Sequence, residues 1–183
     1  MTDIATTDED IKEQSVEYDH EEHELEATGE SRQFLTFMMD DEEYGVDILS
    51  VQEIRGWEPA TVLPNAPDYV KGVINLRGTI VPVVDLRQRF GLDSMEYGAI
   101  TVVVVVKVSL ENNDEKIIGL VVDAISDVYT VKAENMRPAP DITEHANAEF
   151  IENLMNVEKN MVVLLNLPRL MEFSQSSAVQ ATS

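Results

Sequence analysis

The amino-acid sequence predicts a mostly β fold made of two similar modules, each with about five short strands. Two observations lead to this prediction. Short runs of β-branched and aromatic residues alternate with turn-forming Gly, Pro, Asn and Asp, and only brief helical segments interrupt them. In addition, the pattern of the first half recurs in the second half at a nearly fixed spacing. Modules of about five short strands are typical of small β-barrels.

The first module, residues 31–95, contains the first set of expected strands. An acidic turn at Asp40–Glu43 joins the first two of them into a hairpin. Pro82 has no amide hydrogen to donate to a ladder, so we expect its strand to lie at an edge or to carry a bulge there. The runs that are apolar and β-prone are Phe34–Met38, Tyr44–Val46, Ile48–Arg55, Val73–Leu76 and Ile80–Val84.

Two short helical segments are expected in the same module. Tyr69–Gly72 is expected to form one helical turn that ends at its glycine. A second segment, Leu86–Phe90, has Asp85 as a suitable N-cap and Gly91 as a suitable C-cap. Both segments are too short to change the prediction of a mostly β fold.

The second module, residues 96–170, repeats this order of strands and turns. Its first strand, Ile100–Val108, is almost continuously valine, so both of its faces should be covered by other residues. A turn at Asn112–Glu115 follows, and prolines return at Pro138 and Pro140. The other expected strands are Ile117–Val122, Ile125–Val131, Phe150–Val157 and Met161–Leu167.

The two modules are related by spacings of 74 and 81 residues, so the second connection holds 81 − 74 = 7 extra residues. The register holds across Tyr69–Leu86 and includes polar positions, which chance matches between β-rich segments would not preserve. We interpret this as an internal duplication. At the first spacing the pairs include Gly45 with Gly119, Val51 with Ile125, Glu53 with Asp127, and Ile54 with Val128; at the second they include Tyr69 with Phe150, Asn75 with Asn156, and Asp85 with Asn166.

Acidic charge is concentrated at the N-terminus. Residues 1–30 contain 12 acidic residues and one basic residue, a net charge of −11 out of −22 for all 183 residues. This segment has little apolar periodicity, so we expect a disordered acidic arm, and we favour a role in solubility over one in excluding wrong partners. Residues 171–183 are expected to form a polar tail. The net charge argues against nucleic acid and anionic membranes as partners.

The sequence also limits the compartment and the covalent chemistry. It has no cysteine, which excludes disulfides, thiolate metal sites and thiol nucleophiles. The N-terminus has no basic and apolar regions of a signal peptide. The longest apolar run, Val102–Val106, is too short to span a bilayer. We therefore expect a cytoplasmic protein without membrane insertion.

No catalytic constellation is apparent, and no metal site or cofactor is expected. Outside the acidic arm the sequence has one histidine, His145, with no second His or Cys to complete a metal site. Phosphate-binding glycine motifs and a serine elbow are absent. An enzymatic alternative is a carboxylate-based hydrolase, which would need Asp85 and Asp123 to converge in a pocket. Capping of the following helix explains Asp85 better.

One cation stands out within the segment Asn75–Asp85. Arg77 lies between two apolar strands and directly before a tight turn at Gly78. An arginine that only covers neighbouring apolar surface is the default interpretation. A docking arginine is the alternative, because guanidinium groups form forked hydrogen bonds and anchor interfaces. Glu53 offers an opposite charge in the same module, and Trp57 is expected in the core rather than as an exposed docking ring.

These stretches resemble the CheW family, the coupling proteins of bacterial chemotaxis. The resemblance covers about residues 33–170, and the motif NLRGxIxPVxDL is specific to this family and its relatives. It is carried by DEEYGVDILSVQEIRG (Asp41–Gly56), YVKGVINLRGTIVPVVDLRQRF (Tyr69–Phe90), GLVVDAISDV (Gly119–Val128) and RPAP (Arg137–Pro140).

The resemblance implies a fold of two intertwined five-stranded SH3-like β-barrels with short helical turns and a shared apolar core. It implies a non-enzymatic adaptor that links methyl-accepting chemotaxis receptors to the histidine kinase CheA. Such an adaptor works in the cytoplasm at receptor arrays, where it assembles with the kinase into rings. An adaptor of a similar pathway with an output other than swimming is the alternative within this class.

The resemblance also implies a receptor-binding site. In the family, the receptor tip docks in a groove between the barrels, and the positions used map to Glu53, Ile54 and Arg77, with Val102 and Val103 nearby. Two further positions, Val51 and Gly72, are expected to be needed for coupling to the kinase. Arg77 is matched by Glu158 in the second module, so we expect docking specificity to depend on Arg77 and its first-module neighbours.

Overall fold

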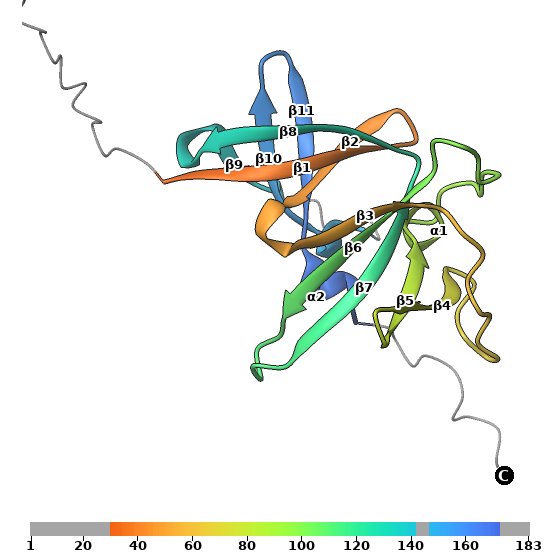
Figure 1. Ribbon diagram of the computed structural model, residues 1–183. Helices are drawn as coiled ribbons and strands as arrows, with labels where there is room; N and C mark the ends of the chain where they lie inside the picture. Colours follow the sequence, from red (N-terminus) through yellow and green to blue (C-terminus); the bar gives the residue numbers. More distant parts are fainter. Residues whose placement is uncertain (1–29, 142–146, 173–183) are drawn as a thin grey trace, which may run out of the picture.

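The computed structural model describes residues 30–141 and 147–172 and arranges them in two β-sheets (Figure 1). Most of the expected acidic arm, His145 and the end of the expected tail lie outside these ranges. Sheet A has the strand order β8-β1-β2-β11-β10-β9, and sheet B has the order β3-β6-β7-β5-β4. The strands are β1 Ser31–Met39, β2 Glu42–Asp47, β3 Val51–Gly56, β4 Val70–Leu76, β5 Thr79–Asp85, β6 Val102–Ser109, β7 Glu115–Val122, β8 Ala124–Lys132, β9 Met136–Pro138, β10 Ile151–Val157 and β11 Asn160–Leu165.

Each sheet takes strands from both halves of the sequence. Sheet A combines β1 and β2 with the late strands β8 to β11, whereas sheet B combines β3 to β5 with β6 and β7. Two parallel pairings, β2 with β11 and β5 with β7, join the contributions of the two halves. The mostly β fold and its intertwining are therefore confirmed. The expected module boundary near residue 95 divides the sequence repeat but does not separate the sheets.

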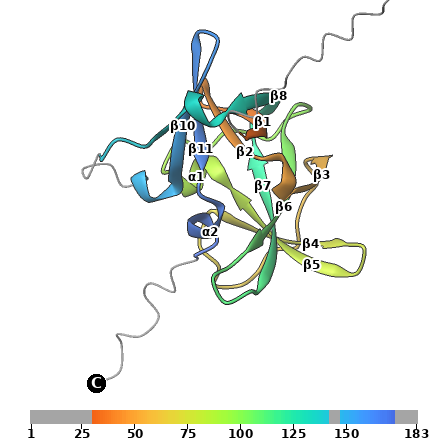
Figure 2. The ribbon, with the colours of Figure 1, turned by 90° about the vertical axis from the view of Figure 1, so that its left-hand side faces the viewer.

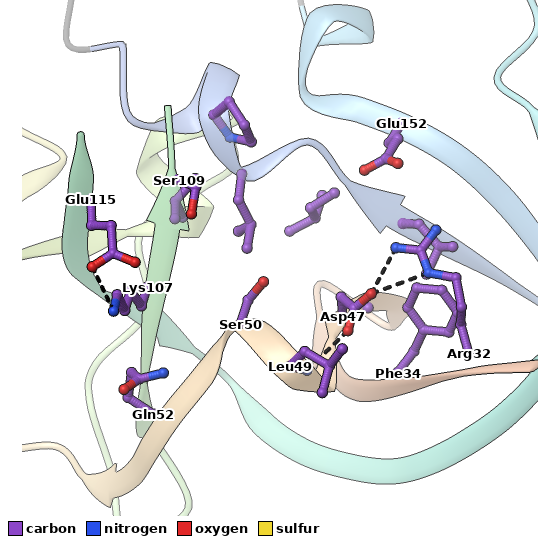
Figure 3. A pocket seen from close by; sticks show the side chains of 16 residues that line it. Arg32, Phe34, Asp47, Leu49, Ser50, Gln52, Lys107, Ser109, Glu115 and Glu152 are labelled. Carbon is purple, nitrogen blue, oxygen red and sulfur yellow. Dashed lines mark hydrogen bonds and ion pairs between the residues drawn. The ribbon is translucent and has the colours of Figure 1, made fainter. Parts of the chain in front are cut away.

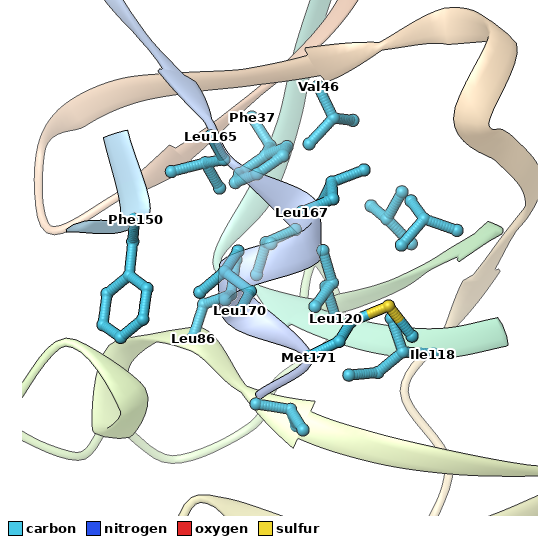
Figure 4. Close-up of a cluster of buried hydrophobic side chains, with 14 of the residues drawn as sticks. Phe37, Val46, Leu86, Ile118, Leu120, Phe150, Leu165, Leu167, Leu170 and Met171 are labelled. Carbon is cyan, nitrogen blue, oxygen red and sulfur yellow. The ribbon is translucent and has the colours of Figure 1, made fainter. Parts of the chain in front are cut away.

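The largest apolar cluster lies between the two sheets and includes residues of two short helices, α1 at Leu86–Arg89 and α2 at Leu167–Leu170 (Figures 2 and 4). The valines of β6 alternate between two clusters. Val104 and Val106 belong to this shared core, while Val103 and Val105 belong to a second cluster on sheet B. All four are buried, which confirms that both faces of this strand are covered. Other members of the shared core include Leu35, Phe37, Met39, Val46, Ile118, Leu120, Phe150, Leu165 and Met171.

Arg87 of α1 ties distant parts of the chain together. Its Nη1 contacts Asp123 Oδ2 at 2.6 Å, at the junction of β7 and β8. Its Nη2 contacts Asp40 Oδ1 at 3.0 Å, in the turn between β1 and β2. Its Nε donates a hydrogen bond to the carbonyl oxygen of Asp93. The Arg87 side chain is only 11% exposed, so this cation fixes the β1–β2 hairpin against sheet B from within the structure.

The expected helical turn at Tyr69–Gly72 is wrong, because β4 begins at Val70. Gly72 is a buried strand residue with φ +134°, and a Cβ there would lie 2.2 Å from the carbonyl oxygen of Thr61. A residue without a side chain is needed because the chain at Thr61 forms a bridge with Val73. The glycine therefore marks a close backbone approach and a bulge in β4, not the end of a helix.

Three other local expectations need adjustment. Ile48–Ser50 forms a 3₁₀ turn (η1) instead of the start of the next strand. The last strand ends at Leu165, because Asn166 caps helix α2 just as Asp85 caps helix α1.

Strand β5 is interior to its sheet, but its pairing with β7 begins at Val83, one residue after Pro82. The missing amide of the proline is thereby kept out of the parallel ladder. Two further 3₁₀ turns are Ala133–Asn135 (η2) and Ala148–Phe150 (η3).

Candidate docking surfaces

A groove of about 510 Å³ lies between the two sheets (Figure 3). We call it the inter-sheet groove. Its walls carry two ion pairs, Arg32 with Asp47 at 2.7 Å and Lys107 with Glu115 at 2.6 Å. The side chain of Leu49 is 86% exposed beside them. The lining residues are Arg32, Phe34, Gly45, Asp47, Leu49, Ser50, Gln52, Lys107, Val108, Ser109, Glu115, Glu152, Leu164, Leu165, Leu167 and Pro168.

The 3₁₀ turn η1 positions Leu49 in this groove. Asp47 caps the turn, since its Oδ1 accepts a hydrogen bond from the amide of Leu49 at 2.9 Å. Its Oδ2 accepts two hydrogen bonds from the guanidinium of Arg32, at 2.7 and 3.1 Å. The same carboxylate therefore holds the turn and one wall of the groove. The sequence does carry a signal for this turn, since the adjacent apolar residues Ile48 and Leu49 break the alternation expected of a strand over Ile48–Arg55.

The predicted receptor-binding residues do not line the inter-sheet groove. Glu53 and Ile54 lie on β3, an outer strand of sheet B, and Arg77 lies at the tip of the β4–β5 hairpin. Arg77 Nη2 is 3.3 Å from Glu53 Oε2. The Arg77 side chain is 85% exposed, and the Ile54 residue is 44% exposed. The structure thus brings Glu53 and Arg77 into contact, although β3 and the β4–β5 hairpin lie at opposite ends of the strand order of sheet B, and we call this surface the β3-hairpin face. Ile54, the next residue of β3, points to the other face of the strand.

The hairpin turn fixes the position of Arg77. Arg77 and Gly78 both have positive φ, +51° and +88°, as a two-residue type I′ hairpin turn requires. Asn75 Oδ1 accepts a hydrogen bond from the amide of Gly78 at 2.8 Å. This bond stabilises the turn from its own strand. The cation therefore projects from a defined backbone conformation.

The ion pair between Glu53 and Arg77 is loose. Glu53 Oε2 is buried, and among the described residues no donor forms a hydrogen bond with it, so the contact with Arg77 is a charge contact without hydrogen-bond geometry. A carboxylate oxygen that is removed from water gains from a donor group. Arg77 therefore retains hydrogen-bonding capacity that another molecule can use, whereas Glu53 Oε2 is buried behind this contact.

The other predicted site residues are less accessible. Val102 and Val103 of β6 pair with Gly56 and Arg55 of β3, and Val103 is only 3% exposed. Val51 packs against the shared core, and Gly72 is buried at the bulge of β4. Val51 and Val102 are half-buried, whereas Gly72 and Val103 are buried, so substitutions at the latter two would act on docking through the shape of sheet B. Trp57 is partly buried and packs against the apolar cluster of sheet B and against the ring of Tyr97, with 4.2 Å between the ring centroids, so it lies at the margin of the core.

Asp85 and Asp123 line one small cavity of about 10 Å³, together with Arg87 and Tyr97. Such a volume holds one water molecule at most. Asp85 is 2% exposed and accepts hydrogen bonds from the amide of Gln88 and the hydroxyl of Tyr97. Burial, with the neighbouring Asp85, raises the pKa of Tyr97 above its usual value. Asp123 is held by Arg87. Both carboxylates are therefore engaged in the fold, and the cavity offers no room for a substrate.

Residues 30–141 and 147–172 contain neither a metal-binding cluster nor a membrane-spanning helix. Within these ranges, no three His, Asp or Glu side chains gather in a way that would hold a metal ion. The helices found there are also too short and too polar to cross a membrane.

Comparisons with known proteins agree on one family. The family model described as "CheW-like domain" matches residues 33–175. The chain is 40% identical over 148 residues to "Chemotaxis protein CheW" of Klebsiella aerogenes, covering 81% of this chain and 86% of that protein. It is 39% identical to "Probable chemotaxis protein CheW" of Rhizobium etli, covering 80% and 92%. Among solved structures, scaffolding protein TtCheW from Thermoanaerobacter tengcongensis matches with a TM-score of 0.71 and 28% identity, covering 79% of this chain and 95% of that one.

Proposed function

Because the chain belongs to the CheW-like domain family, we propose that it is a non-enzymatic adaptor that couples methyl-accepting chemotaxis receptors to the histidine kinase CheA. The names of its relatives support a scaffolding role in chemotaxis, since two are called chemotaxis proteins and the solved relative is called a scaffolding protein. The adaptor would work in the cytoplasm at receptor arrays, within rings that it forms with the kinase.

We place the receptor contact at the β3-hairpin face. The observation that carries this proposal is the exposed cation of Arg77 on a fixed turn, beside a buried Glu53 oxygen that accepts no hydrogen bond among the described residues. The guanidinium offers forked donors to a receptor side chain or carbonyl, and the charge of Glu53 holds the cation beside β3. Ile54 adds exposed apolar area on the other face of β3, because neighbouring residues of a strand point to opposite faces. Arginine is one of the side chains that most often anchor protein interfaces.

The inter-sheet groove is a second surface for the same partner. Leu49 supplies an exposed apolar contact, and the two ion pairs on the walls supply polar ones. A helix that lays one apolar face into a groove is a common recognition mode. Strand β3 links the two surfaces, because Gln52 lines the groove and Glu53 belongs to the β3-hairpin face. A receptor helix hairpin that uses both would contact opposite sides of one strand.

The adaptor would transmit the receptor state through unequal affinity. A bridge that binds two receptor arrangements equally well shifts no equilibrium, so the contacts at Arg77 or Leu49 must differ between the arrangements. The proposal therefore requires more than binding: kinase activity must depend on the adaptor and on the receptor ligand together.

Reconstitution of receptor, kinase and this protein tests the proposal. We expect receptor-controlled kinase activity only when the adaptor is present. Arg77→Ala should weaken receptor binding about 30-fold, which corresponds to the ~2 kcal/mol of a truncated interface anchor. Lys159→Ala is the matched control, because Lys159 lies in the equivalent turn between β10 and β11. Kinase activity that is the same with and without the adaptor would refute the function, and unchanged binding by Arg77→Ala would refute only this site.

A further inference from the structure

The two sheets have the same construction once the halves of the chain are matched. Five strands of each sheet correspond in the same order. In sheet A these are β8, β1, β2, β11 and β10, and their counterparts in sheet B are β3, β6, β7, β5 and β4. Among the described strands, only β9 at the edge of sheet A has no counterpart. In each sheet the central hairpin, β1–β2 or β6–β7, comes from the other half of the chain. The halves therefore exchange their first hairpins reciprocally (Figures 1 and 2).

The joints between the halves match residue by residue. In sheet A, Gly45 of β2 pairs with Leu164 of β11, and in sheet B, Gly119 of β7 pairs with Val83 of β5. The spacings of 74 and 81 residues relate both members of these pairs. Each glycine also has close neighbours at its joint, since an added Cβ would lie 3.0 Å from the Leu164 side chain in the first case and 2.8 Å from the Val103 side chain in the second.

Helix caps, turns and core contacts repeat the same relation. Asp85 and Asn166, which are matched by the repeat, cap α1 and α2 in the same way. Arg77 and Glu158 begin the two equivalent turns with φ values of +51° and +52°. The exchange is therefore a property of both halves and not an irregularity of one.

One exposed segment joins the two halves. On its N-terminal side, the amide of Leu92 donates a hydrogen bond to the carbonyl of Arg87. On its C-terminal side, Tyr97 is held by its hydroxyl against Asp85 and by its ring against Trp57. The four residues between these anchors, Asp93–Glu96, are exposed and have no regular secondary structure. They are the only covalent link between residues 31–92 and 97–172.

We propose that these two halves are complementary units of one kind, and that the hairpin-receiving surface of each unit accepts the matching unit of a second copy of this chain. In the monomer the linker Asp93–Glu96 lets both units of one chain pair with each other. When the linker is too short for that, the same contacts are satisfied between two chains. Because both arrangements contain the same pairings, the choice depends on the linker and on the concentration of chains.

Deletion of Ser94–Glu96 in the full chain tests this proposal. We expect the molar mass measured by light scattering to double, with an unchanged circular dichroism spectrum. The matched control inserts six Gly and Ser residues at the same place, and this variant should remain monomeric. A deletion variant that is folded and monomeric at all concentrations would refute the proposal.

A second variant decides the question if the deletion variant does not fold. A protease site is inserted between Ser94 and Met95, and the full chain is cut after folding. The two fragments should elute together in native buffer, because each holds the hairpin of the other. When two cut copies with different tags are mixed, partly denatured and restored, mixed pairs of halves should form. Fragments that separate without denaturant, or halves that never form mixed pairs, would overturn the proposal.

Discussion

Replacement of Arg87 by methionine should destabilise the protein by about 3 kcal/mol. The side chain is 11% exposed and joins α1 to Asp123 and Asp40, at 2.6 and 3.0 Å. Without it, Asp123, whose side chain is 18% exposed, would keep a poorly hydrated charge with no cation. Removing one partner of a buried ion pair costs about 3–5 kcal/mol. We expect the lower end of this range, because Asp40 is 56% exposed and water can replace its contact.

Urea denaturation measures this effect, with the fluorescence of the single tryptophan, Trp57, as the probe. The matched control is Arg169→Met, since Arg169 and Glu172 form a pair that is 54% and 64% exposed. Such a surface pair contributes about 0–1 kcal/mol. Adding Asp123→Asn to Arg87→Met should recover part of the loss, because it removes the uncompensated charge. If Arg87→Met lowers the free energy of unfolding no more than the control does, the ion pairs do not hold the hairpin against sheet B.

Three further predictions concern stability. Gly72→Ala should cost several kcal/mol, because φ is +134° and the new Cβ would meet Thr61, and a thermal melt that matches the wild type would contradict this. Burial raises the pKa of Tyr44 to about 12, so its contribution to stability should be present below pH 10 and lost as the pH rises from 10 to 12. Because solvent screens this partly buried phenol, we expect a loss of about 1 kcal/mol. Tyr44→Phe should remove this part of the loss in urea titrations, while the part due to Tyr97 remains. Asn166→Ala should cost about 1 kcal/mol by uncapping α2, and an unchanged denaturation midpoint would show that the cap is not needed.

The strands were largely predictable from the sequence, whereas their neighbours in the sheets were not. Alternation and valine content reveal which residues of a strand are buried, as for Val103 and Val104. They do not say which strand lies alongside, because that depends on contacts between segments far apart in the sequence. The repeat matched Gly45 to Gly119, but nothing local indicates that each glycine packs on a strand of the other half. The family resemblance implied that the two modules intertwine, but which hairpins they exchange became visible only in the structure.

The candidate site was predictable where it is local. The motif around Arg77 and Gly78 indicated a tight turn that carries a cation, and the structure adds the contact with Glu53. The inter-sheet groove was not predictable, because Arg32, Lys107 and Glu152 come from segments that no sequence pattern links. For Val103, the expected place near the receptor site conflicted with the expectation that both faces of its strand are covered. A strand with both faces covered leaves that side chain unable to touch a partner directly.

The two equivalent hairpin turns separate what the fold needs from what docking needs. Arg77 and Glu158 adopt the same left-handed conformation, at φ +51° and +52°, so the fold requires the backbone of this turn in both halves. It does not require a particular charge, because the two residues have opposite charges at the same place. Exposed apolar residues persist on the matching outer strands β3 and β8, Ile54 and its match Val128 being 44% and 45% exposed. The charge of the turn residue is therefore the property by which two otherwise similar faces can choose different partners.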